Sequence, residues 1–126
     1  SEVKRMNAGS EEKLGTLKIS DDVIAVCTMN ATQKTKGVAG FSSVFSDNIS
    51  KNIFGKEPLY KGIKVNQNEE GISIDVYVIV EYGVKIPEVA WDIQENVKKE
   101  VENMTEAAVK AVNIHVQGVH FTDEED

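Results

Sequence analysis

The chain has 126 residues, of which 40% are hydrophobic and 28% charged, which is the size and composition of one globular domain with a single core. Its formal net charge of −7 disfavours a nucleic-acid partner and adsorption to anionic lipid, because both require clustered Lys and Arg. No apolar run approaches the roughly 20 residues that cross a bilayer, and the single cysteine, Cys27, cannot form an internal disulfide. These features indicate a cytoplasmic protein without a membrane span of its own.

The two ends of the chain differ in composition from its centre. Residues 1–13 are mostly polar and predict a flexible leader without an apolar signal core. Residues 122–126 predict a solvated acidic tail. We therefore expect a single domain over residues 14–121.

The first half of this domain predicts a strand, a helix and a less regular stretch. Residues 14–20 alternate like a short strand, and Ser20 then begins a helix that ends near Thr35. The apolar stripe of that helix consists of Val23, Ile24, Cys27 and Ala31. Two glycines in GVAG, residues 37–40, indicate a break. The apolar spacing of residues 41–54 predicts a short extra helix that Gly55 would end.

The second half gives the clearest periodicity. Residues 60–66 and 72–80 predict two strands joined by a polar turn, and in the second strand every other side chain is apolar. A helix begins at Pro87 and runs to Met104, with one apolar stripe: Val89, Ala90, Ile93, Val97, Val101 and Met104. A last strand places Val112, Ile114 and Val116 inward, and Gly118 marks a bulge before residues 119–121.

The order of elements is thus strand, helix, strand, strand, helix, strand. This order predicts an α+β fold with a mainly antiparallel sheet of about four strands and two long helices on one face, of the split βαβ kind. The extra residues 37–58 leave the exact topology open.

The residues that could carry chemistry form no recognisable catalytic, cofactor or metal motif. Gly55 and Lys56 lack the rest of a phosphate-binding loop, and GVAG has the wrong spacing for a dinucleotide fingerprint. His115 and His120 are interpreted as surface histidines, and Cys27 as a buried, inert thiol. Glu88 and Asp92, four residues apart on one helix, are typical of a solvated face.

Aromatic residues are the candidates for partner binding. Trp91 either completes the core or is an anchor for a partner, and its place at the edge of the apolar stripe favours the core. Phe41, Phe45 and Phe54 lie between glycines, where a contact between copies or with a partner would form. We therefore expect residues 41–54 to mediate association.

Several motifs together resemble one bacterial family. YGVKIPEVA at residues 82–90, with IQ at 93–94 and VK at 97–98, is similar to the signature of the alkaline shock protein 23 family, the envelope stress proteins that include the Gls type. GTLKI at 15–19, GVAG at 37–40, KGIKV at 61–65, VNIHV at 112–116 and GV at 118–119 resemble further family segments in the same order. The helix of residues 20–35 departs from the family in the polar runs CTMN and QKTK.

The resemblance implies a binding function. Members are small cytoplasmic proteins of Gram-positive and related bacteria, without established catalytic residues, some held at the membrane by a separate anchor protein. It thus implies a non-enzymatic, self-associating scaffold that lies at the inner face of the membrane through a membrane-anchored partner. The alternative is a regulator of a lipid-biosynthesis enzyme such as acetyl-CoA carboxylase. The surface near Tyr82, Lys85 and Trp91 is then a further candidate contact face.

Overall fold

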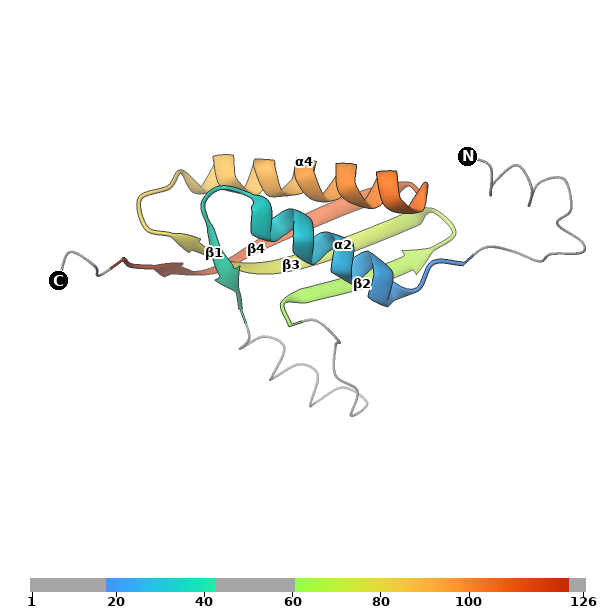
Figure 1. Cartoon of the computed structure of the whole chain (residues 1–126), viewed down its shortest axis with the longest axis horizontal. Helices are drawn as coiled ribbons and strands as arrows, with labels where there is room; N and C mark the ends of the chain where they lie inside the picture. Colours follow the sequence, from blue (N-terminus) through green and yellow to red (C-terminus); the bar gives the residue numbers. More distant parts are fainter. Residues whose placement is uncertain (1–17, 43–60, 123–126) are drawn as a thin grey trace, which may run out of the picture.

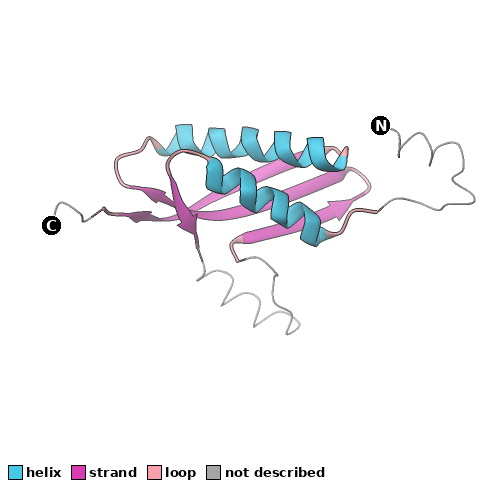
Figure 2. Ribbon diagram, viewed as in Figure 1, coloured by secondary structure: helices cyan, strands magenta, loops and turns pink. Residues whose placement is uncertain are grey.

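The computed structural model of the protein describes residues 18–42 and 61–122. The helices in this part are α2 (Asp21–Lys34) and α4 (Ile86–Thr105), and the strands are β1 (Val38–Phe41), β2 (Ile63–Asn68), β3 (Gly71–Glu81) and β4 (Val109–His120). Both helices lie on one face of a single sheet (Figures 1 and 2). The predicted α+β class, with two long helices on one face, is confirmed.

The sheet is built around β3, which pairs with each of the other described strands. On one edge β3 pairs with β4 in parallel, and on the other it pairs antiparallel with both β2 and β1, which follow one another along that edge. Two of the three pairings are antiparallel, as the sequence predicted. The parallel pairing brings the C-terminal ends of β3 and β4 to the same end of the molecule.

The core lies between the sheet and the two helices. The alternating side chains of β3 that face the helices are at most 2% exposed: Ile72, Ile74, Val76, Val78 and Val80. The helices cover them with Ile24 and Ala31 from α2 and with Ile93, Val97 and Val101 from α4. Burial of this continuous apolar layer is the main favourable term for the fold.

The face that helix α2 buries consists mostly of small side chains, several of them polar. Ser20 caps the helix by accepting a hydrogen bond from the Val23 N–H at 3.3 Å. The hydroxyls of Thr28 and Thr35 donate to the carbonyls four residues earlier, at 2.8 and 2.9 Å, which satisfies them inside the core. Thr32 is also fully buried, and its hydroxyl has no partner among the described residues.

Three predictions in the first half are wrong or fall outside the described residues. Residues 18–20 form no strand, since Ser20 caps α2, and residues 14–17 are not described. The predicted break at residues 37–40 contains β1 instead: only Gly37 adopts a positive φ, +98°, and the chain then extends to pair with β3. Phe41 ends β1 rather than beginning a helix, and residues 43–54, like the leader and most of the tail, lie outside the described residues.

The second half follows its predictions closely. β2 and β3 are joined by a tight turn in which the Asn68 side chain accepts from the N–H groups of Glu70 and Gly71. The register of β4 shifts next to Gly118, which confirms the predicted bulge. Met104 is the exception, because it is 62% exposed while Thr105 is buried. The buried positions of α4 recur every fourth residue, so they rotate round the helix by roughly 40° per repeat and reach residue 105 in the last turn.

Candidate interaction surfaces

One end of the molecule presents a group of exposed apolar side chains, which we call the aromatic end: Tyr82, Ile86, Val119 and Phe121. Tyr82 follows β3 and Phe121 follows β4, and the parallel register that pairs Glu81 with His120 places them side by side. Their rings are 4.7 Å apart between centroids, yet the two residues remain 68% and 63% exposed. Two adjacent aromatic side chains therefore face solvent on one surface.

The backbone beneath the aromatic end is held by hydrogen bonds. The Tyr82 N–H donates to the His120 carbonyl at 2.9 Å, and the ring of His120 lies 3.0 Å from a carboxylate oxygen of Glu81. Gly83, at φ +93°, then turns the chain towards α4. Lys85, the N-cap of α4, is exposed in the same turn. Tyr82 and Lys85, both predicted as contact residues, thus lie close together on a fixed backbone.

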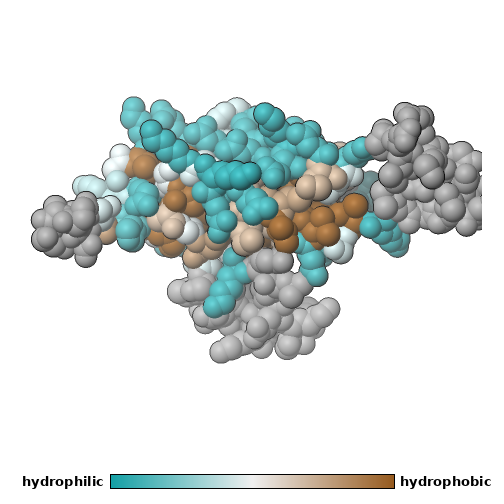
Figure 3. Space-filling model, viewed as in Figure 1, coloured by the Kyte–Doolittle hydropathy of each residue, from teal (hydrophilic) through white to brown (hydrophobic). Residues whose placement is uncertain are grey.

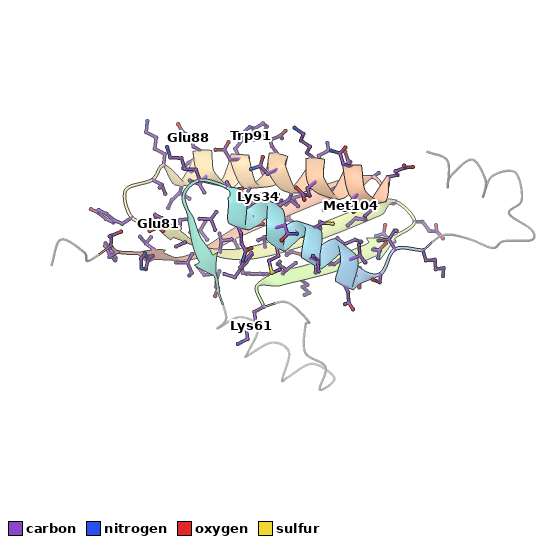
Figure 4. All side chains as sticks on the ribbon, viewed as in Figure 1. Lys34, Lys61, Glu81, Glu88, Trp91 and Met104 are labelled. Atoms are coloured by element: carbon purple, nitrogen blue, oxygen red, sulfur yellow. The ribbon has the colours of Figure 1, made fainter. Side chains whose placement is uncertain are left out.

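Trp91 lies on the outer side of α4, so its predicted place in the core is wrong. It is 60% exposed, and Figure 4 shows Trp91 and Glu88 directed away from the sheet. The reason is helical geometry: residues 89 and 93 are buried, and residue 91 is about 200° from each of them round the helix. Glu88 and Asp92 are also exposed, as predicted for a solvated face.

Phe41 is half-buried against the core rather than free at the surface. A Cβ atom added to Gly62 would lie 2.9 Å from the Cβ of Phe41, so glycine is needed where the start of β2 approaches the end of β1. Phe45 and Phe54 are outside the described residues. The structure therefore does not group Phe41 with Tyr82, Lys85 or Trp91.

The face of the sheet opposite the helices carries a polar and aromatic cluster. His115 lies between Asp75, with the ring nitrogen 2.9 Å from the carboxylate, and Tyr77, whose ring is stacked on it at 4.3 Å between centroids. The Asn113 amide donates to the same carboxylate at 3.2 Å. Burial and the nearby Asp75 charge raise the pKa of Tyr77. His115 is thus a half-buried structural residue rather than a plain surface histidine.

The outer surface of the helices is hydrophilic. Figure 3 shows this along the side formed by α4. A shallow groove of about 570 Å³ between α2 and α4 is lined by Lys34, Asn96, Lys99 and Asn103, among others. Cys27 of α2 is buried as predicted, and burial, followed by the charge of Glu100, raises the pKa of its thiol. In residues 18–42 and 61–122, no three His, Cys, Asp or Glu side chains come close enough to bind a metal ion.

Comparison with known proteins identifies the family. A family model described as having a cell envelope-related function matches residues 9–121. The chain belongs to the alkaline shock protein 23 family. It is 39% identical to the protein YqhY of Bacillus subtilis over 86% of its own length and 79% of that protein, and 41% identical to YloU of the same organism over 88% and 93%.

A more distant relative in this family carries a stress-response name. The stress response regulator gls24 homolog of Streptococcus pyogenes is 26% identical over 81% of this chain and 57% of that protein. Among solved structures, MamM-CTD matches 79% of this chain and 99% of its own at a TM-score of 0.46 and 11% identity, too weak a likeness to indicate a shared function. Neither described helix of the present protein has both the length and the apolar composition needed to span a membrane.

The aromatic end contains residues that the sequence did not single out. Val119 and Phe121 were assigned only to the end of the last strand, and Ile86 only to the family motif before the helix, whereas all three are at least 40% exposed. The signal in the sequence was the apolar alternation of residues 119 and 121 at the end of the last strand. It becomes meaningful only when the parallel register of β4 is known.

Proposed function

We propose that this protein is a non-enzymatic binding protein of the cell-envelope stress response, which self-associates and binds a membrane-anchored protein. It would act in the cytoplasm, at the inner face of the membrane, through that partner. Two findings support the proposal: membership of a family with a cell envelope-related function, and a relative named as a stress response regulator.

The observation that carries the proposal is the aromatic end. Tyr82 and Phe121 expose more than three-fifths of their surface although they lie against each other. Aromatic residues on a fixed backbone lose little conformational entropy when a partner covers them, and they dominate the energy of many protein interfaces. The hydrogen bond from the Tyr82 N–H to the His120 carbonyl provides such a backbone. We therefore assign the partner contact to this end.

The charge around the aromatic end suggests the chemistry of the partner segment that would bind there. Lys85 is exposed beside Tyr82, whereas His120 is paired with Glu81. A short, partly apolar segment with a carboxylate near its end would bury the two rings and pair with Lys85. We expect such a segment next to the membrane-spanning part of the partner.

The test is capture of partners from detergent-solubilised membranes of the native host. The immobilised protein should retain a protein with a membrane-spanning segment. Phe121→Ser should lose it, and Met104→Ser should keep it, because Met104 is equally exposed at the other end of α4. Equal capture by the two variants would remove the aromatic end from the proposal. Recovery of acetyl-CoA carboxylase subunits instead would favour regulation of lipid synthesis.

A further inference from the structure

The outer edge of β4 has backbone groups that no described element pairs. β4 is hydrogen-bonded to β3 along one edge only. Two side chains of α4 reach over the start of its other edge: Gln94 donates to the Val112 carbonyl at 3.0 Å, and Glu102 accepts from the Val109 N–H at 2.9 Å. Since Val112 directs its carbonyl outward, Ile114 and Val116 direct their backbone groups outward too, because alternate residues of a strand point the same way. These groups have no partner among the described residues.

Apolar side chains accompany this open edge. Ile114 and Val116 pair with core positions of β3 and are only half-buried, because nothing described lies beyond them. The edge thus offers hydrogen-bonding groups together with an apolar layer, the combination that recruits another strand.

The charge of β4 favours a second copy of this chain as that strand. The chain has a net charge of −7, but β4 itself contains no carboxylate. Its basic side chains, Lys110, His115 and His120, each lie against a carboxylate of the same copy, so the strand presents little unpaired charge. Two copies that meet along β4 therefore avoid the repulsion expected elsewhere on their surfaces.

We propose that β4 pairs antiparallel with β4 of a second copy, about a twofold axis at His115, so that the two sheets become one. In this register Ile114 of each copy is opposite Val116 of the other, and both exchange backbone hydrogen bonds. The inference rests on the self-association in the proposed function and specifies its surface.

A cysteine scan tests the register. His115→Cys should form a disulfide-linked dimer under mild oxidation, because the two residues at the axis face each other with Cα atoms roughly 4.5 Å apart. Asn113→Cys is the matched control, since its two copies would be offset by four residues, roughly 13 Å. The parent protein controls for Cys27. Equal crosslinking of the two variants, or none in a protein that is dimeric by sedimentation, would overturn the inference while leaving self-association intact.

An edge-blocking variant tests the contact without a crosslink. Val116→Lys places a charge from each copy at the new junction and should abolish the dimer in sedimentation, while the circular dichroism of the fold is retained. Gln117→Lys, exposed on the same strand, should leave the dimer intact. A dimer that survives Val116→Lys would contradict the inference. A parent protein that is monomeric at all concentrations would overturn the self-association itself, which separates the two failures.

Discussion

The two faces of β3 differ in burial and in the kind of side chain that they carry. On the helix side its side chains are aliphatic and at most 2% exposed, whereas on the other side Ser73, Asp75, Tyr77, Ile79 and Glu81 are half-buried and mostly polar or aromatic. The first face therefore determines stability, because it forms the middle of the core. We expect the second face, the strand ends and the outer edge of β4 to tolerate substitution without loss of the fold, because their side chains are less buried. The proposed contacts would thus lie on surfaces separate from the one that determines stability.

The largest expected effect is on the helix side of β3. Ile74→Ala should lower the free energy of unfolding by about 3 kcal/mol, because it leaves a cavity under both helices. Ser73→Ala, the neighbour on the other face, should change it by less than about 0.5 kcal/mol. Denaturant unfolding with an unchanged m-value measures both. Similar losses for the two variants would break the distinction between the faces.

A smaller loss of stability is expected on the face of the sheet opposite the helices. His115→Ala should cost about 1 kcal/mol, because it removes the stack on Tyr77 and the hydrogen bond to Asp75. His120→Ala is the control, since that histidine also contacts a carboxylate but is more exposed, 57% against 37%. Its cost should lie clearly below that of His115→Ala. A larger loss for His120→Ala would mean that the cluster around Asp75 does not support the fold.

The pH dependence of the free energy of unfolding should reflect the ionisation of the buried Cys27 thiol. Burial raises the pKa of Cys27 above its ordinary value of 9.0, so in alkali the unfolded chain loses this proton first. The stability is therefore intact below pH 9 and falls as the pH rises through this value, by at most about 1.4 kcal/mol per pH unit for one group. Cys27→Ala should flatten this decline until Tyr77, whose pKa is also raised, begins to contribute. An unchanged slope in Cys27→Ala would contradict the assignment.

Periodicity in the sequence was enough to predict the core. The alternation of β3, the start of α4 and the bulge at Gly118 depend on residues close in the chain, and the structure confirms them. The predicted place of Trp91 was wrong because the residue is two positions from both Val89 and Ile93, which puts it about 200° round the helix from these buried side chains. The glycines of GVAG were misinterpreted because pairing with β3, a distant segment, converts most of the predicted break into a strand.

The proposed contact surfaces were harder to predict than the core. Tyr82 and Lys85 were chosen from the sequence, but Phe121 becomes the neighbour of Tyr82 only through the parallel register of β3 and β4. The outward direction of the Ile114 and Val116 backbone likewise depends on which edge of β4 meets β3. Such properties arise from long-range strand pairing, which no local pattern specifies.

The smallest effect on stability should come from the aromatic end, and this makes it the most direct test of the account. The double variant Tyr82→Ser with Phe121→Ser should change the free energy of unfolding by less than about 0.5 kcal/mol, because both side chains are exposed. The same variant should lose most of the membrane protein that the parent captures, at equal protein concentration. Capture equal to that of the parent, or loss of capture together with loss of the fold, would contradict the claim that binding and stability lie on separate surfaces.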